Sequence, residues 1–249
     1  MLNLNRVKGL IFDYGATIDS NGKHWAEVLW DAYVEIGVPV EKSGFRDAYV
    51  YAERYLALNP VIQPGFTFKE VLIAKTGLQV HWLIENGLLS KEDKKTSEYS
   101  FSVSEQCYNF ACSTIEKAKL VLDKLFERYP LVLVSNFYGN IEAVLKDFGL
   151  QKYFVEIVES AVVGVRKPDP AIFSLGVKAL ELPAKNVVVV GDSYKKDIAP
   201  AQSLGCQAVW IKGPAWEEEN SKLTAEAVIY DFSELENVFR MEDRKSGRP

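Results

Sequence analysis

Short runs of consecutive apolar residues, rich in Val, Ile and Leu, constrain the fold of this chain more than any other feature. They occupy residues 7–12, 131–134, 187–190 and 208–211, with a weaker run at residues 228–230. A strand that is apolar at every position needs cover on both faces, as in a parallel sheet packed between helices. Helical periodicity separates the later runs, so strand and helix alternate along the second half of the chain. The sequence therefore predicts an α/β domain with a parallel sheet.

Helical periodicity without a convincing buried strand fills the long interval between the first two runs. Apolar residues recur at helical spacing over residues 25–36, where Gly37 follows as a typical helix end, and again over residues 45–56. We therefore expect a helical module inserted between the first strand and the rest of the α/β domain.

The expected domain boundaries follow from these patterns. Ser113 and Glu116 have the spacing of a capping box, which predicts the start of a helix at this point. The last residues are rich in charge and look like a frayed end. The expected division is an α/β core domain from residues 1–20 and 113–240, a helical domain over residues 21–112 and a charged tail over residues 241–249.

Composition and charge exclude several classes of protein. Of the 249 residues, 48% are hydrophobic and 25% charged, which is typical of a folded globular chain. The 29 basic and 34 acidic residues give a formal net charge of -5 and no overall basic field, so we expect no nucleic-acid partner. No apolar stretch approaches the ~18 residues of a membrane span, and the first residues lack the apolar run of a signal peptide. With an odd number of cysteines, three, we expect a reduced, cytoplasmic protein without a membrane partner. The sequence does not indicate an oligomeric state.

Polar side chains stand directly after the apolar runs, which is where an open parallel sheet binds its ligand. The first three runs are followed in turn by Asp13, by Ser135 and Asn136, and by Asp192 with Asp197 further on. Lys167 lies in a proline-containing turn that precedes another helical pattern. We expect these side chains to meet at one edge of the sheet.

The chemistry of this set points to phosphoryl transfer. The carboxylates of Asp13 and Asp192 are hard oxygen ligands of the kind that Mg²⁺ prefers. The Ser135 hydroxyl and the Lys167 ammonium can hold phosphoryl oxygens, and the lysine offsets repulsion between an anionic substrate and the acidic residues. Asp13 can be the attacking carboxylate, as in aspartyl-phosphate chemistry. The expected cofactor is therefore Mg²⁺.

Four segments, in this order, resemble the motifs of the haloacid dehalogenase superfamily of phosphohydrolases. They are residues 12–17 (FDYGAT), 134–136 (VSN), 166–173 (RKPDPAIF) and 190–198 (VGDSYKKDI). The resemblance covers nearly the whole chain, and the helical module takes the place of the cap that one branch of the superfamily inserts after its first motif. It implies a three-layer, doubly wound, Rossmann-like core with an α-helical cap that closes over the active site.

The resemblance also assigns roles to the matching residues. Asp13 would be the nucleophile and, together with Asp192 and the backbone carbonyl of Gly15, would bind Mg²⁺. Ser135 and the adjoining Asn136 would bind the phosphoryl group. The implied substrate is a small phosphorylated metabolite, and the implied activity is that of a phosphatase-like hydrolase.

Three further residues complete the set that the resemblance implies. Lys167 would bind the phosphoryl group and steady the charge on the nucleophile. Asp197, the second acid of the fourth motif, would orient Lys167 or metal-bound water. Thr17 would mainly support the loop of the first motif.

Gly15 departs from the pattern of the family. Its phosphatases carry a second Asp two residues after the nucleophile, as general acid for the leaving group and general base for water. Such help is typically worth ~10²- to 10⁴-fold in rate. We therefore expect slow turnover of ordinary phosphomonoesters, whereas an acyl phosphate, with its good leaving group, can still phosphorylate Asp13. Asp19 is a candidate replacement acid.

Three alternatives stay open. Phosphonate hydrolases also place a small residue at the position of Gly15, but they need a cap lysine that forms a Schiff base; the candidates are Lys23, Lys42, Lys69 and Lys75. Dehalogenases carry a Tyr two residues after the nucleophile, whereas Tyr14 is one residue after it. The third alternative is a weakened or non-catalytic relative that binds a phosphorylated metabolite or a protein partner.

Overall fold

The computed structural model describes residues 1–214 and 223–240. The charged tail expected over residues 241–249 lies outside the described residues. Within them, no helix combines the length and the apolar character needed to cross a membrane.

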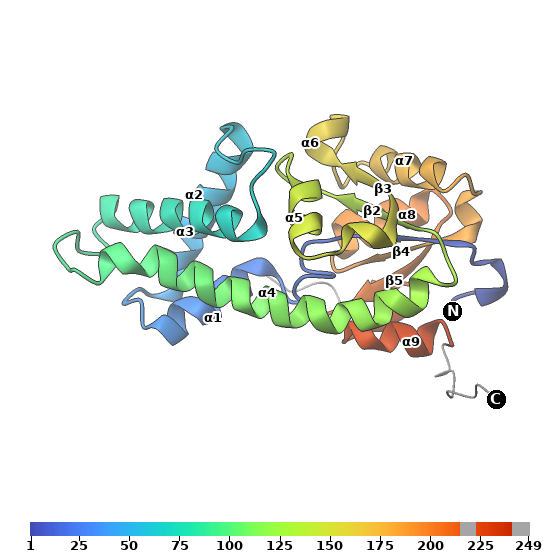
Figure 1. Cartoon of the computed structure of the whole chain (residues 1–249), viewed down its shortest axis with the longest axis horizontal. Coiled ribbons are helices and arrows are strands. Elements are labelled where there is room, and N and C mark those ends of the chain that lie inside the picture. The colour runs from blue at the N-terminus through green and yellow to red at the C-terminus, as the bar shows by residue number, and fades with distance from the viewer. Residues whose placement is uncertain (215–222, 241–249) are drawn as a thin grey trace.

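A six-stranded sheet forms the centre of one half of the molecule (Figure 1). All neighbouring strands pair in parallel, in the order β3-β2-β1-β4-β5-β6. The strands are β1 (Gly9–Phe12), β2 (Leu131–Ser135), β3 (Phe154–Glu159), β4 (Val187–Gly191), β5 (Gln207–Ile211) and β6 (Ala227–Ile229). The chain starts in the middle of the sheet and winds outward in both directions, so the doubly wound α/β fold is confirmed.

Side chains of the central strands alternate between two hydrophobic cores. Leu10 and Phe12 point to a core that contains Leu122 of α4 (Thr96–Phe126), whereas Ile11 points to a core that contains Phe173 of α7 (Ala171–Ala179). Because both faces are covered by helices, every residue of β1, β2 and β4 is buried. This burial explains why these strands are readable as continuous apolar runs.

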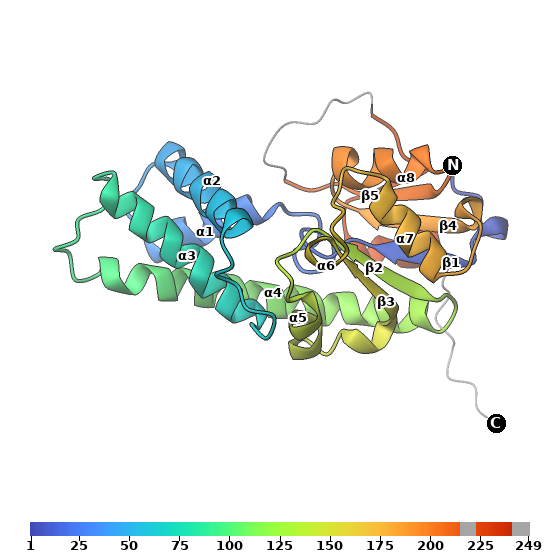
Figure 2. The ribbon, with the colours of Figure 1, turned by 90° about the horizontal axis from the view of Figure 1, so that it is seen from above.

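The helices that cover the sheet lie in two layers (Figure 2). One core includes residues of α4 (Thr96–Phe126), α5 (Ile141–Asp147) and α9 (Leu235–Val238). The other includes residues of α7 (Ala171–Ala179) and α8 (Ala199–Ser203). The short helix α6 (Ser160–Val163) follows β3, and a single π-helical turn, η4 (Tyr194–Ile198), follows β4.

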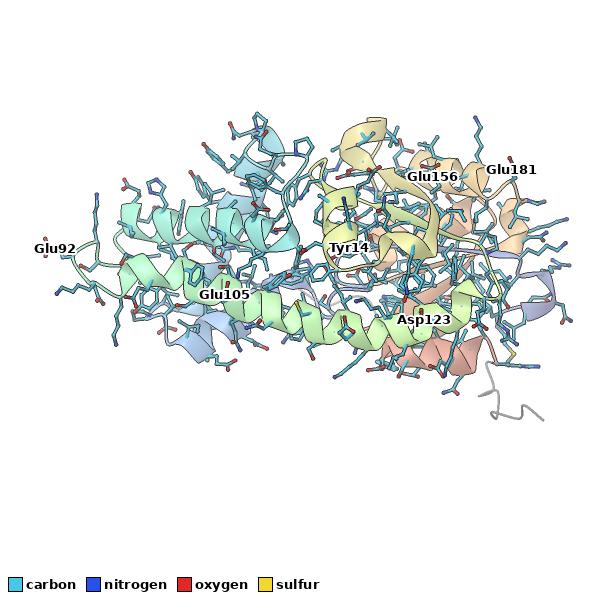
Figure 3. All side chains as sticks on the ribbon, in the orientation of Figure 1. Tyr14, Glu92, Glu105, Asp123, Glu156 and Glu181 are labelled. Carbon is cyan, nitrogen blue, oxygen red and sulfur yellow. The ribbon has the colours of Figure 1, made fainter. Side chains whose placement is uncertain are left out.

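The strand β3 is not predicted by the sequence pattern. It is an edge strand whose Val155 is 58% exposed, and the neighbouring Glu156, labelled in Figure 3, is also exposed. Only one end of the strand is buried. A strand with one solvated edge and a partly solvated face has no continuous apolar run to reveal it.

The described residues between β1 and β2 contain helices and no strand. They are α1 (Trp25–Ile36), α2 (Lys42–Leu58), α3 (Phe68–Glu85) and α4, whose second half packs against the sheet. Gly37 ends α1 with a φ of 77°, as its position in the sequence predicts. The side chain of Thr67 accepts from the backbone of Glu70 in a capping box that begins α3. Figure 1 shows α1, α2, α3 and the first part of α4 beside the sheet, and we call these helices, with residues 96–112 of α4, the helical insertion.

The capping box expected at Ser113 and Glu116 is wrong. Both residues are exposed and lie inside α4, which runs without a break for 31 residues. Buried residues such as Cys107, Ala111, Ile115 and Ala118 keep one face of α4 apolar across the expected boundary. Figure 3 marks the two halves of this helix, with Glu105 in the helical insertion and Asp123 beside the sheet.

Candidate active site

Three of the expected site residues follow adjacent strands at the same edge of the sheet. Asp13 comes after β1, Ser135 ends β2 and Asp192 comes after β4. The backbone N–H of Asp13 donates to the carbonyl of Val190 at 2.9 Å, which holds the start of its loop against β4. Because β2, β1 and β4 are neighbours and parallel, their carboxyl ends bring these residues together.

Lys167 lies at the centre of this group and is 4% exposed. Its Nζ lies 2.6 Å from Oδ1 of Asp13 and 2.7 Å from Oδ1 of Asp197. The side-chain amide of Asn136 accepts from the backbone N–H of Lys167 at 2.9 Å and donates to its carbonyl at 3.0 Å. The loop after β2 therefore fixes the backbone of the lysine, while two carboxylates fix its ammonium group.

The carboxylates of Asp13, Asp192 and Asp197 form one acidic cluster. One oxygen of each lies within 4.8 Å of the others. Thr17 donates its hydroxyl to Asp192 at 3.3 Å, and the backbone N–H of Ser193 donates to Asp197 at 3.0 Å. A Cβ at Gly191 would lie 2.5 Å from the Cβ of Asp197, so this close approach requires glycine.

Electrostatics at the cluster favour a further cation. Burial raises the pKa of Asp13, although Lys167 opposes this rise. Burial, reinforced by Asp197 and Asp13, raises the pKa of Asp192 well above its usual value. Burial alone would lower the pKa of Lys167, but Asp13 and Asp197 outweigh it and raise that pKa. One buried ammonium faces three carboxylates, and their hard oxygen ligands fit a divalent ion such as Mg²⁺.

Gly15 and Asp19 lie in the loop after Asp13, and both line the same cavity. A Cβ at Gly15 would meet no atom within 4 Å, and the φ of Gly15 is outside the left-handed region. Asp19 is fully buried, and its two oxygens accept from the backbone N–H of Ala16 at 2.8 Å and from the indole N–H of Trp25 at 2.9 Å. Burial raises the pKa of Asp19 to about 7. The carboxyl of Asp19 thus ties its loop to the first residue of α1.

The cavity has a volume of about 1490 Å³ and is lined by both the strand-end loops and the helical insertion. From the loops come Asp13, Gly15, Ser135, Lys167 and Asp192. From the insertion come Tyr49, Glu53 and Lys75, together with His24 at its start. The insertion thus occupies the place expected for a cap.

Of the residues of the insertion that line the cavity, the sequence names Lys75 only as one of four candidate cap lysines, although Lys75 carries a more specific signal. It stands on the buried stripe of α3, at helical spacing from Val71, Leu72 and Gln79. Its Nζ lies 2.6 Å from Oε1 of Glu53 on α2. A lysine on the apolar stripe of an amphipathic helix indicates a buried charge.

The other residues that the alternatives depend on lie elsewhere. Lys23 pairs with Asp31, Lys42 with Glu27 and Lys69 with Glu105, and all three lysine side chains are more exposed than that of Lys75. Tyr14, labelled in Figure 3, is fully buried, and its ring packs edge-on against those of Phe68 and Phe137. Tyr14 therefore joins the core to the helical insertion.

Comparison with known families gives a match over most of the chain. The model of the haloacid dehalogenase-like hydrolases matches residues 7–205. The protein called haloacid dehalogenase-like hydrolase domain-containing protein 3 of Danio rerio is 36% identical over 103 residues, which are 41% of this chain and 43% of that protein. The chain thus spans about half the length, or less, of such relatives.

Two further relatives carry the names of phosphatases. The 5-amino-6-(5-phospho-D-ribitylamino)uracil phosphatase YigB of Escherichia coli is 27% identical over 124 residues, half of each chain. The glyceraldehyde 3-phosphate phosphatase of Pyrococcus furiosus is 30% identical over 98 residues, which are 39% of this chain and 40% of that one.

Solved structures share the whole fold at low sequence identity. A dehalogenase with an intermediate complex has a TM-score of 0.65 at 15% identity, and the match covers 97% of this chain and all of that one. The magnesium-bound HAD-hydrolase YfnB of Bacillus subtilis has a TM-score of 0.53 at 19% identity, with 95% and 100% covered. Both matches include the helical insertion as well as the sheet.

Proposed function

The chain belongs to the haloacid dehalogenase-like hydrolase family, and from that membership we propose that it is a Mg²⁺-dependent hydrolase that transfers the phosphoryl group of a small phosphorylated metabolite to Asp13. The observation that carries the proposal is the contact of Lys167 with Asp13 and Asp197, beside Asp192. This arrangement provides a carboxylate nucleophile and a fixed positive charge next to it. The phosphatase names of two relatives agree with this chemistry.

The proposed reaction has two steps. In the first, a carboxylate oxygen of Asp13 forms a bond to phosphorus, while the bond from phosphorus to the leaving oxygen breaks and its electron pair leaves with that oxygen. In the second, the oxygen of a water molecule forms a bond to phosphorus while the bond from phosphorus to the Asp13 oxygen breaks; the carboxylate is restored, and inorganic phosphate leaves with the protons of that water. Lys167 and the Ser135 hydroxyl hold the phosphoryl oxygens, and the ammonium reduces the charge repulsion between Asp13 and the substrate.

Asp13, Asp192 and the backbone carbonyl of Gly15 would hold Mg²⁺. When bound, the ion supplies positive charge that stabilises the phosphoryl oxygens. Thr17 orients Asp192 through its hydroxyl, and Asp197 orients Lys167 through the ion pair. Asn136 acts through the backbone of Lys167, to which both ends of its amide are bound.

Gly15 determines which leaving groups this site tolerates. A leaving alkoxide needs a proton, and Gly15 has no side chain to give one. Asp19 lies four residues further along the chain, and its carboxyl is held by the backbone N–H of Ala16 and the indole N–H of Trp25, which fix it at the start of α1. Acyl phosphates, whose leaving carboxylate needs no proton, are therefore better substrates than alkyl phosphates.

The alternatives have less support from the contacts around the site. A Schiff base needs a neutral lysine amine, whereas Glu53 holds the ammonium of Lys75 in its charged form. A role for Tyr14 in dehalogenation conflicts with its packing between two aromatic rings. Gly15 is the observation that favours a non-catalytic, phosphate-binding relative, but the paired Lys167 and Asp13 favour chemistry.

The proposal is tested by turnover of acetyl phosphate, p-nitrophenyl phosphate and phosphonoacetaldehyde, with and without Mg²⁺. We expect Mg²⁺-dependent release of phosphate, fastest from acetyl phosphate, and its loss in Asp13→Asn. Release that persists in Asp13→Asn, or no release from any compound by the wild type, would refute the proposal. Turnover of phosphonoacetaldehyde alone would favour phosphonate cleavage instead.

A further inference from the structure

An ion pair with a buried lysine lines the part of the cavity that the helical insertion contributes. Lys75 and Glu53 approach to 2.6 Å, and 11% of the lysine side chain and 33% of the glutamate side chain are exposed. The hydroxyl of Tyr138, in the loop after β2, donates to the other oxygen of Glu53 at 3.0 Å. The ammonium of Lys75 lies 5.6 Å from the centroid of the Tyr138 ring. These three side chains, the Lys75 cluster, join the insertion to the sheet at the wall of the cavity that contains Asp13.

The Lys75 cluster is poorly explained as a source of stability. Removing two charges from water costs free energy that their attraction only partly returns, so apolar residues of similar size often serve a core equally well. The neighbouring lysines Lys23, Lys42 and Lys69 keep 23%, 42% and 38% of their side chains exposed, where an ion pair has little cost. Lys75 is more buried than these three lysines and lines the cavity, which suggests a role in binding.

The free hydrogen-bonding capacity of the cluster defines the ligand group that it fits. Burial alone would lower the pKa of Lys75, but Glu53, together with Tyr138 and Tyr49, outweighs burial and raises that pKa, so the ammonium stays charged. The ammonium has three donors and the carboxylate about four acceptor positions, more than the contacts within the cluster use. A hydroxyl group satisfies both at once, because it accepts from Lys75 while it donates to Glu53.

Other ligand groups fit the cluster less well. An anionic group would meet the carboxylate of Glu53 beside the lysine, and a cationic group would meet the lysine. An apolar group would leave both charges without hydrogen bonds from water. A neutral hydroxyl is therefore the best match to an adjacent pair of opposite charges.

We propose that Lys75 and Glu53, supported by Tyr138, form a specificity site for hydroxyl groups of the leaving group, so that among phosphate esters of alcohols those of polyhydroxylated alcohols are preferred. This inference rests on the proposed function, because it places the phosphoryl end of the same molecule at Asp13. The cavity of about 1490 Å³ exceeds the roughly 300–1,000 Å³ of typical small-molecule pockets, so both ends of such a molecule fit.

Binding to the Asp13→Asn protein tests the inference without consuming the ligand. Calorimetric titration with Mg²⁺ compares sorbitol 6-phosphate with hexyl phosphate, which has the same carbon chain without hydroxyls. The measured quantity is the ratio of the two Kd values. Hydrogen bonds to charged groups are worth about 10- to 100-fold in affinity, so Lys75→Met should reduce the preference for sorbitol 6-phosphate by about that factor.

Two companion variants make the result specific. Lys42→Met removes a lysine of the insertion that is more exposed than Lys75 and pairs with Glu27, and it should leave the ratio unchanged. Glu53→Gln keeps the side-chain volume and should shift the ratio in the same direction as Lys75→Met, which also provides a test if that variant does not fold. Thermal unfolding of each variant shows that it is folded.

Two outcomes would overturn the inference. One is a ratio that Lys75→Met and Glu53→Gln leave unchanged, even if both variants are less stable, since the cluster would then be structural. The other is no binding of either phosphate. Hydrolysis of acetyl phosphate by the wild type reports on the proposed function separately. If the wild type hydrolyses acetyl phosphate but the variants leave the ratio of Kd values unchanged, only the specificity site is refuted. If Lys75→Met changes the ratio of Kd values but the wild type does not hydrolyse acetyl phosphate, only the hydrolase is refuted.

Discussion

Gly15→Asp should convert this site into a faster phosphomonoesterase. A Cβ at Gly15 meets no atom within 4 Å, the residue does not have a left-handed φ, and it lines the cavity two residues after Asp13. The Cβ of an aspartate can therefore enter without steric cost, and we expect its carboxyl to reach the leaving group. General acid and base catalysis contributes ~10²- to 10⁴-fold, or about 2.7 to 5.4 kcal/mol of activation free energy.

The assay compares kcat/KM for an alkyl phosphate and for acetyl phosphate in the presence of Mg²⁺. Only the alkyl leaving group needs a proton. In Gly15→Asp, kcat/KM for the alkyl phosphate should therefore rise by the full ~10²- to 10⁴-fold, whereas kcat/KM for acetyl phosphate should rise by less. Gly15→Asn is the matched control, since it adds the same volume without a transferable proton. Equal rates for Gly15→Asp and wild type, with both proteins folded, would refute the reasoning, and so would an equal rise in Gly15→Asn.

Two further predictions concern charge burial. Lys167→Met leaves Asp13 and Asp197 without their shared partner, and breaking a buried pair in this way costs about 3–5 kcal/mol. Lys42→Met, at a more exposed pair, should cost about 0–1 kcal/mol. Urea unfolding of both variants without Mg²⁺ measures the two losses in the free energy of unfolding. Equal losses would contradict the conclusion that Lys167 is a buried, paired charge. For His24, burial lowers the pKa from 6.5 to about 4, so its contribution to stability is present above pH 6.5 and is lost as the pH falls toward 4. The loss amounts to as much as about 3 kcal/mol. The variant His24→Asn keeps a hydrogen-bond acceptor at the start of α1 but has no group that titrates. Between pH 6.5 and pH 4, the free energy of unfolding of this variant should therefore fall less than that of the wild type. Equal slopes of unfolding free energy against pH would show that His24 is not buried as the neutral imidazole.

The sheet and the main site are predictable because they depend on local sequence and on one topological rule. A strand covered on both faces, such as β4, is apolar at every position, so it stands out in the sequence. Parallel neighbours end at the same edge, and this brings Asp13, Ser135 and Asp192 together without any knowledge of packing angles. The edge strand β3 has no such signature, because its middle is exposed.

What could not be predicted depends on how helices pack in three dimensions. The pairing of Lys75 with Glu53 joins α3 to α2, and their register follows from side-chain packing along both helices. The continuity of α4 through Ser113 overrides a local capping signal, because buried residues on one face of the helix contact the insertion and the sheet in succession. The engagement of Asp19 with Ala16 and Trp25 likewise depends on where α1 begins.

Trapping of the phosphorylated protein tests the central claim, that Asp13 accepts the phosphoryl group, most directly. The wild type would be mixed with acetyl phosphate and Mg²⁺, quenched in acid and examined by intact and peptide mass spectrometry. Because Gly15 provides no base for the attacking water, the aspartyl-phosphate should accumulate, as the added mass of one phosphoryl group on the peptide that contains Asp13. The adduct should be absent from Asp13→Asn and reduced in Gly15→Asp. A phosphoryl group on any other residue, or hydrolysis of acetyl phosphate with no adduct even at the shortest quench times, would contradict the account.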